Sequence, residues 1–154
     1  MSLQFLVGGS VSVINIMIHA LITLVAIGIA RRAGLQRTSR PRLHLMTVMV
    51  VTALVLMIAH TVETIGWSLA YAVVGAAPAG SDLLDFAFVN YTTLGYGDVT
   101  PLKEWRLLGP MTATNGILMF GWSTALLFEV LRRTIEHLAL IAPSDAPFNS
   151  ADPD

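Results

Sequence analysis

Three long apolar stretches constrain the fold of this chain more than any other feature of its sequence. They cover residues 3–30, 45–74 and 107–131. A helix needs about 20 predominantly apolar residues to cross the roughly 30 Å hydrocarbon core of a bilayer, and each stretch is long enough. The composition agrees, because 55% of the residues are hydrophobic and only 12% are charged. We therefore predict an all-α integral membrane protein with three transmembrane helices.

The basic residues predict how these helices are oriented in the cell membrane. Lys103 and Arg106 lie between the second and third stretches, and all other basic residues fall at the opposite side of the membrane. These others are Arg31, Arg32, Arg37, Arg40, Arg42, Arg132 and Arg133. Because basic residues concentrate in cytoplasmic loops, we predict an amino terminus outside and a cytoplasmic carboxyl terminus.

No pattern in the sequence indicates an enzyme, a cofactor or a nucleic-acid partner. The net charge of -1 gives no basic surface for nucleic acid, and the absence of cysteine excludes disulfides and thiolate metal sites. There is no phosphate-binding glycine loop. The first apolar stretch also lacks an arginine ladder, so the sequence gives no basis for an Arg-rich voltage sensor.

The segment between the second and third stretches predicts a short helix that does not cross the membrane. Residues 75–80 are small and include Pro78, so we expect the second helix to end there. Ser81 or Asp82 can cap a helix that runs to about Tyr91. Irregular backbone at membrane depth is tolerated only when it is buried in protein or lines a water-filled path. We therefore predict a re-entrant pore helix, whose negative carboxyl end favours a cation.

The sequence that follows this helix suits the binding of a dehydrated cation. It reads Thr92-Thr93-Leu94-Gly95-Tyr96-Gly97-Asp98. A potassium ion in a narrow pore needs carbonyl oxygens in place of water, and these carbonyls must all point to one side. A regular strand alternates their direction, and φ > 0 breaks that alternation at low steric cost only at glycine, as at Gly95 and Gly97. A flexible turn is the alternative for the Gly-Tyr-Gly tripeptide alone.

Residues 92–98 resemble the selectivity filter of the bacterial potassium channel pore-domain family, whose two-span module carries the filter between its helices. The resemblance implies that K+, the permeant ion, binds the backbone carbonyls of Thr93, Leu94, Gly95 and Tyr96 and the hydroxyl of Thr93. It also implies that the Tyr96 ring points outward and that Asp98 lies at the outer mouth. Because one filter strand cannot enclose an ion, we predict a homotetramer around a central axis.

The third apolar stretch carries a second resemblance to the same family. Residues 115–125, with the sequence Asn-Gly-Ile-Leu-Met-Phe-Gly-Trp-Ser-Thr-Ala, are similar to its inner helix. Gly116 falls at the family's hinge glycine, although a role in close helix packing is equally open. The resemblance implies that Ile117, Phe120 and Thr124 line the cavity and that Phe128 lies nearer the intracellular gate.

These resemblances divide the chain into four parts. Residues 45–133 form the pore module of outer helix, pore helix, filter and inner helix. Residues 1–30 add an N-terminal transmembrane helix, and residues 31–44 form an Arg-rich cytoplasmic loop. Residues 134–154 form a cytoplasmic tail that we expect to be partly disordered.

The pore helix departs from the family's pattern at the positions that support the filter. Asp85-Phe86 stands where many members have an aromatic pair, and Val89 stands where some bacterial channels have a glutamate. His60 and Glu63 are candidates to replace this support, because they share one face of the second helix. We hypothesise that one of them hydrogen-bonds the back of the pore helix or filter. The alternative is that Glu63 reaches interfacial water and His60 only packs.

Three further polar side chains lie in apolar segments, namely His19, Asn90 and Asn115. We expect His19 to be packed or capped rather than a ligand, and we expect Asn90 and Asn115 to make structural hydrogen bonds rather than contact an ion. The predicted function is passive, selective permeation of K+ through a tetrameric pore. Two alternatives stay open: a weakly selective cation channel, and a non-conducting membrane subunit or scaffold.

Overall fold

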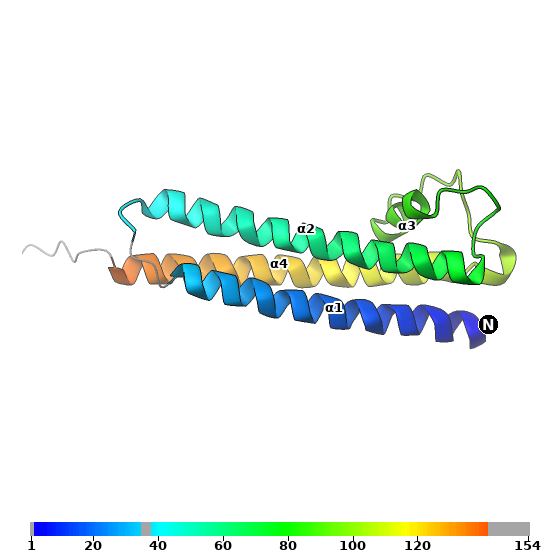
Figure 1. Ribbon diagram of the computed structural model, residues 1–154, viewed down its shortest axis with the longest axis horizontal. Coiled ribbons are helices and arrows are strands. Elements are labelled where there is room, and N and C mark those ends of the chain that lie inside the picture. Colours follow the sequence, from blue (N-terminus) through cyan, green and yellow to red (C-terminus); the bar gives the residue numbers. More distant parts are fainter. Residues whose placement is uncertain (1, 35–37, 142–154) are drawn as a thin grey trace, which may run out of the picture.

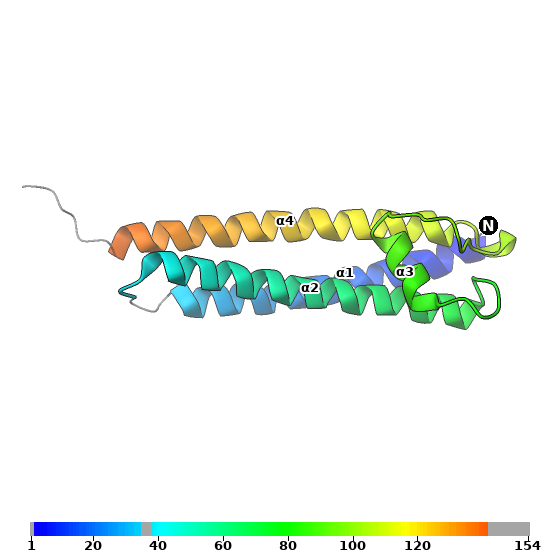
Figure 2. The same ribbon diagram turned by 90° about the horizontal axis from the view of Figure 1, so that it is seen from above.

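The computed structural model describes residues 2–34 and 38–141, and its regular elements are helices. The elements are α1 (Ser2–Gly34), α2 (Pro41–Val74), α3 (Leu83–Tyr91), the 3-10 helix η1 (Lys103–Trp105) and α4 (Leu108–Ile141). The part of the chain that is described contains no strand. Helices α1, α2 and α4 lie side by side along the long axis (Figures 1 and 2), and α1 packs against both of the others. All three are long and apolar enough to cross a membrane, which confirms the predicted fold class.

The long helices extend beyond the apolar stretches that predicted them. Helix α1 continues to Gly34 and α2 begins at Pro41, so much of the predicted loop 31–44 is helical. Arginine is a good helix former, and proline suits the first position of a helix, so neither residue type ended a helix at the predicted boundary. Arg37 lies outside the described residues.

Helix α4 also continues past the predicted end of the pore module at residue 133. It runs to Ile141, so the first part of the predicted tail 134–154 is helical. Here Glu129 pairs with Arg132 and Arg133, and Arg132 pairs with Glu136, at the spacing that supports a helix. Residues 142–154, to which the prediction of disorder chiefly applied, lie outside the described part of the chain.

The turn after α2 and the start of α3 follow from local sequence. Gly75 caps α2 in the left-handed conformation, with φ of 64°, as glycine commonly does at a helix end. The carboxylate of Asp82 accepts hydrogen bonds from the backbone N–H groups of Leu84 and Asp85, at 3.0 and 3.1 Å. Of the two predicted caps, Asp82 is therefore the one that starts the short helix.

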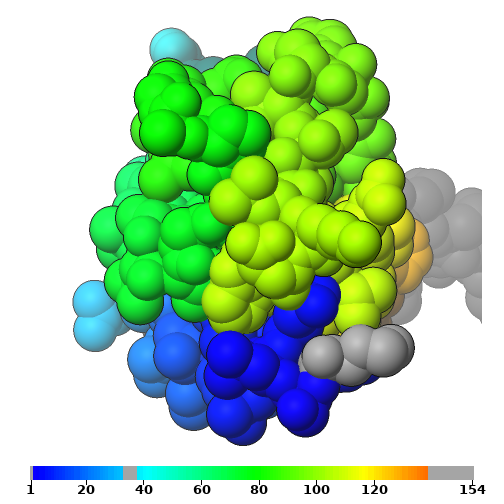
Figure 3. Space-filling model, turned by 90° about the vertical axis from the view of Figure 1, so that its right-hand side faces the viewer, coloured from blue at the N-terminus to red at the C-terminus, as the bar shows by residue number. Residues whose placement is uncertain are grey.

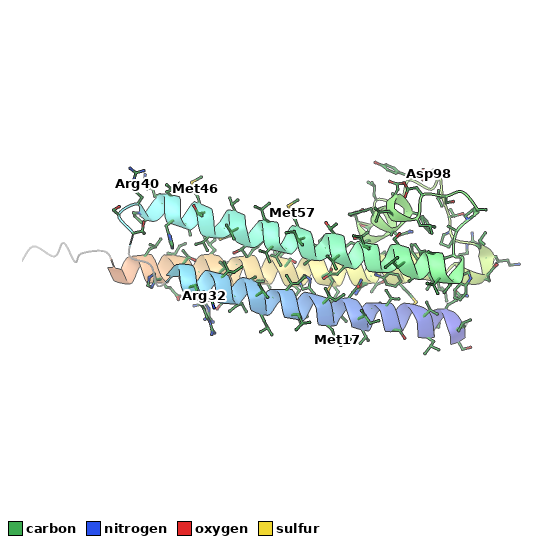
Figure 4. All side chains as sticks on the ribbon, in the orientation of Figure 1. Met17, Arg32, Arg40, Met46, Met57 and Asp98 are labelled. Atoms are coloured by element: carbon green, nitrogen blue, oxygen red, sulfur yellow. The ribbon has the colours of Figure 1, made fainter. Side chains whose placement is uncertain are left out.

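Two apolar clusters hold the bundle together. One lies around α3 and is built mainly from aromatic side chains of α2 and α3, with Leu108 and Met119 of α4. The other joins the opposite ends of α1, α2 and α4. Large apolar side chains also cover the outside of the bundle, such as Met17, Met46 and Met57 in Figure 4, each more than half exposed. Such a surface is typical of helices that face lipid.

The two ends of the bundle differ in charge and in structure. Arg32 and Arg40 lie at one end, and Asp98 lies at the other (Figure 4). The amino terminus is at the same end as α3 (Figure 1), which is the end at which Figure 4 labels Asp98. The short helix and the segment after it thus lie opposite the arginine-rich end, as the predicted topology requires.

Candidate functional site

The segment 92–98 lies at the surface of the end shown in Figure 3 and is exposed throughout. Tyr96 is 71% exposed and Leu94 is 56% exposed. The expected packing of the Tyr96 ring against its surroundings is therefore not supplied by this chain alone. Exposed apolar surface of this kind marks a site of contact with other protein or with lipid.

The backbone of this segment adopts a left-handed conformation at every second residue. The φ angles are 62° at Thr93, 61° at Gly95 and 84° at Gly97. The two glycines have the positive φ expected from the sequence. The repeat with a period of two matters because a regular strand would otherwise point its carbonyls alternately to opposite sides.

The positive φ of Thr93 was not expected, and the end of α3 explains it. The N–H of Thr93 donates to the carbonyl of Asn90, and the N–H of Leu94 donates to the carbonyl of Val89, both at 3.0 Å. These two bonds form a Schellman motif, which requires a left-handed residue at the position of Thr93. Glycine usually occupies that position, and a residue with a Cβ atom costs about 1–2 kcal/mol there.

The four residues that were predicted to line the cavity and gate share the exposed face of α4. Ile117, Phe120, Thr124 and Phe128 are all exposed, whereas Met119, Ser123 and Leu126, which lie between them, are buried against the other helices. Ile117 and Phe128 are 61% and 67% exposed. The chain therefore presents most of this face away from its own core, and Phe120, which is 37% exposed, also packs on Tyr91 with ring centroids 5.5 Å apart.

Gly116 lies where α4 crosses the end of the pore helix. A Cβ atom at this position would be 2.0 Å from the backbone oxygen of Tyr91, which is far inside van der Waals contact. Gly121 in the same helix has no atom within 4 Å of such a Cβ. The packing role left open for Gly116 is thus present in the structure, and the hinge role stays a prediction.

His60 and Glu63 both reach the pore helix. The hydroxyl of Tyr91, the last residue of α3, donates to Oε2 of Glu63 at 2.5 Å and lies 3.1 Å from Nδ1 of His60. The side chain of Glu63 has no exposed surface, so the alternative that it reaches interfacial water does not hold. The contact is with the pore helix just before the segment 92–98, and not with that segment itself.

Two residues from the other helices join these three in a closed ring of hydrogen bonds. His19 Nδ1 of α1 lies 2.7 Å from Glu63 Oε1. Ser123 Oγ of α4 lies 3.0 Å from His60 Nε2 and 3.3 Å from His19 Nε2. We call Glu63, His19, Ser123, His60 and Tyr91 the polar ring. It joins all four α-helices at the point where the pore helix ends.

Sequence reasoning missed three members of the polar ring. His19 was expected to pack or to be capped, and Tyr91 and Ser123 were not considered. A signal for His19 was present, because it is the sole acidic, basic or histidine residue of the first apolar stretch, residues 3–30. An ionisable side chain at membrane depth needs a partner, and the second stretch holds His60 and Glu63.

A second group of buried polar side chains lies beside the ring. Nδ2 of Asn15 donates to the backbone oxygen of Glu63 at 3.2 Å and to Oδ1 of Asn115 at 3.0 Å. The indole N–H of Trp67 donates to the same oxygen of Asn115 at 3.0 Å. Nδ2 of Asn90 bonds the carbonyl of Phe86 within its own helix. The two asparagines that were singled out thus make structural hydrogen bonds, as expected.

The pore-helix positions that depart from the family pattern do not themselves provide polar support for the filter. Asp85 is exposed, and the apolar side chain of Val89 is buried. Phe86 packs on Tyr71, with ring centroids 5.0 Å apart. The polar bonds from other helices therefore reach the pore helix through Tyr91 and not through these positions.

Three side chains of the ring, His19, His60 and Glu63, are of types that can bind a metal ion. One ligand atom from each of His19, His60 and Glu63 lies within 4.8 Å of the others. Two histidines and a carboxylate are a set that Zn²⁺ accepts. Each of these side chains already has a hydrogen-bond partner in the ring, so the arrangement does not require a metal ion.

Comparison with protein families supports a membrane transport role for this part of the chain. A family model described as an ion channel matches residues 43–133. The match covers more than half of the chain and includes α2, α3, the exposed segment 92–98 and most of α4. The searches of curated proteins and of solved structures find no match.

Proposed function

Because this chain belongs to the ion channel family, we propose that it is a potassium-selective channel. Four copies would surround one axis, and K+ would pass down its electrochemical gradient. The backbone oxygens of Thr93, Leu94, Gly95 and Tyr96 and the hydroxyl of Thr93 would take the place of water around the ion. Fourfold assembly is required because the oxygen cage of a filter is built from four strands.

The observation that carries this proposal is the backbone of the segment 92–98. A left-handed residue at every second position, together with full exposure of the segment, suits carbonyls that serve a ligand outside the chain. The exposed face of α4 with Ile117, Phe120, Thr124 and Phe128 supports the same assembly, since it would face the axis. Within the membrane we propose that this end is extracellular, because the arginines gather at the opposite end.

Ion flux through purified protein in liposomes tests the proposal. We expect K+ flux that barium blocks, and a reversal potential that follows the K+ gradient when Na+ replaces K+ on one side. The matched pair of variants is Gly95→Ala and Gly9→Ala. A Cβ at Gly95 has space but stands on a backbone with φ of 61°, whereas Gly9 is helical with no atom within 4 Å.

We expect Gly95→Ala to lose K+ selectivity or flux and Gly9→Ala to behave as the wild type, because alanine is strained where φ is positive. A reversal potential that treats K+ and Na+ alike would favour a weakly selective cation channel. Absence of barium-sensitive flux from assembled protein would favour a non-conducting subunit.

A further inference from the structure

The polar ring has one hydrogen bond more than its protons can supply when Glu63 is ionised and both histidines are neutral. The ring has five bonds, which run from Glu63 to His19, Ser123, His60, Tyr91 and back to Glu63. Each bond needs one proton between its two heavy atoms. Ser123 and Tyr91 bring one each, the two neutral imidazoles bring one each, and the carboxylate brings none. Four protons therefore serve five bonds.

One additional proton completes the ring and makes its net charge zero. Whether the carboxylate of Glu63 or the imidazole of His19 holds this proton, it lies in the 2.7 Å bond between them. Without it, the ring has a net negative charge that is buried at membrane depth, where an uncompensated charge is costly. Burial of Glu63 and closure of the ring therefore both favour the bound proton.

When the added proton leaves, the single N–H of neutral His19 serves the bond to Glu63, so the bond between His19 of α1 and Ser123 of α4 is the one left without a proton. Ser123 has a single hydroxyl proton, and without the added proton the Nε2 atoms of His19 and His60 both present lone pairs to it. Its distance is 3.0 Å to His60 and 3.3 Å to His19. The longer contact is the weaker one, so loss of the proton detaches His19 from Ser123.

We propose that the polar ring is a binding site for a single proton, which closes the ring between His19 of α1 and Ser123 of α4. The same ring holds Tyr91, the last residue of the pore helix, which immediately precedes the segment 92–98, so the proton completes the support of the proposed filter. Potassium conduction is then greatest when the ring is protonated and falls as the pH rises. This dependence of conduction rests on the proposed channel function.

The groups around Glu63 agree with one exchangeable proton. The titratable groups that face it are His19 of α1, His60 of its own helix and Tyr91 of α3. Helix α4 contributes the hydroxyl of Ser123. Aromatic side chains of α4 lie beside the two histidines. The ring centroids of Trp122 and His19 are 5.4 Å apart, and those of Phe120 and His60 are 4.6 Å apart.

A proton suits this site better than a divalent metal ion. Direct bonds from His19, His60 and Glu63 to a metal would displace the hydrogen bonds that these side chains now make. A divalent ion would also place two positive charges beside a single buried carboxylate. The proton leaves every bond in place and balances the charge.

The ratio of K+ flux at about pH 5 to that at about pH 8, with equal pH on both sides of the liposome, tests the proposal. For the wild type we expect a ratio of about ten, the effect of one hydrogen bond on an equilibrium. The ratio compares each protein with itself at two pH values, so differences in absolute flux between variants do not affect the comparison. We expect the ratio to approach one in Glu63→Gln, because the amide brings the missing proton itself. We expect the same in Ser123→Ala, which leaves no fifth bond to complete.

Two controls accompany these variants. His44→Gln removes a histidine outside the ring and is expected to keep the wild-type ratio. Addition of EDTA is expected to leave the ratio unchanged, and a change would overturn the choice of a proton over a metal ion. A wild-type ratio of one, or the wild-type ratio retained in both Glu63→Gln and Ser123→Ala, would overturn the proton site.

The melting temperature as a function of pH tests the same site without any conduction. Above about pH 6.5 the folded ring holds a proton that the two histidines of the unfolded chain have released, so its stabilisation is lost as the pH rises further. We expect this fall in His44→Gln and the wild type, and a smaller fall in Glu63→Gln and Ser123→Ala. If the fall is the same in all four proteins, the proton site is wrong. If it differs as expected but no K+ flux is found, the channel function is wrong and the proton site stands.

Discussion

Gly116→Ala is expected to disrupt the pore module, because among the glycines of the described chain Gly116 gives an added methyl group its closest contact. The new Cβ would lie 2.0 Å from the carbonyl oxygen of Tyr91, and this oxygen belongs to the backbone, so no change of rotamer can relieve the contact. Overpacking of this kind costs about 1–3 kcal/mol or more, against a gain of about 1 kcal/mol from the better helix former. We expect at least tenfold lower K+ flux and a lower melting temperature.

Gly121→Ala is the matched control, because it makes the same change in the same helix with no atom of the chain within 4 Å of the new Cβ. The melting temperature also separates the two roles considered for Gly116. Steric displacement of the pore helix lowers it, whereas loss of a flexible hinge alone does not, because alanine stabilises a helix. A Gly116→Ala protein with normal flux and melting temperature would show that the contact with Tyr91 is relieved without cost.

Glu63→Ala is expected to produce the second large effect. It removes the acceptor of Tyr91 and the partner of His19, and both remain buried beside the space that the carboxylate leaves. Removing one partner from a buried charged network costs about 3–5 kcal/mol, because the other groups lose their bonds without regaining water. We expect a lower melting temperature and weaker support of the pore helix, measured as reduced K+ flux.

Glu136→Ala is the control for this change. Glu136 pairs with Arg132 at 2.7 Å, but both side chains are about half exposed, so water replaces the lost interaction. We expect a much smaller effect on the melting temperature. Equal effects of Glu63→Ala and Glu136→Ala would contradict the role assigned to burial.

Much of the fold could be predicted because it depends on neighbours in sequence. The apolar stretches gave three membrane-spanning helices, and the turn after α2 and the cap at Asp82 follow from residue types within a few positions. The positive φ at Gly95 and Gly97 follows from the same kind of local reasoning. The predicted positions of the helix ends were less accurate, because arginine-rich segments continue a helix beyond the apolar residues that identify it.

The support of the pore helix could be predicted only in part. The shared face of α2 pointed to His60 and Glu63, because their spacing is local. Their partners are distant in sequence: His19 is separated from Glu63 by 44 positions and from Ser123 by 104. Nothing in the local pattern of α1 or α4 indicates which helix faces bring these side chains together.

The sequence by itself therefore determined that the chain is a helical membrane protein with a short helix between its second and third long helices, and it predicted a backbone suited to a cation. Length, hydropathy and glycine position act locally, so they can be read without knowing how the helices pack. The tertiary structure alone decided that Gly116 accommodates the end of the pore helix and that α1 completes the polar ring. These features depend on which faces of four helices meet, and buried polar groups find their hydrogen-bond partners only when that packing is complete.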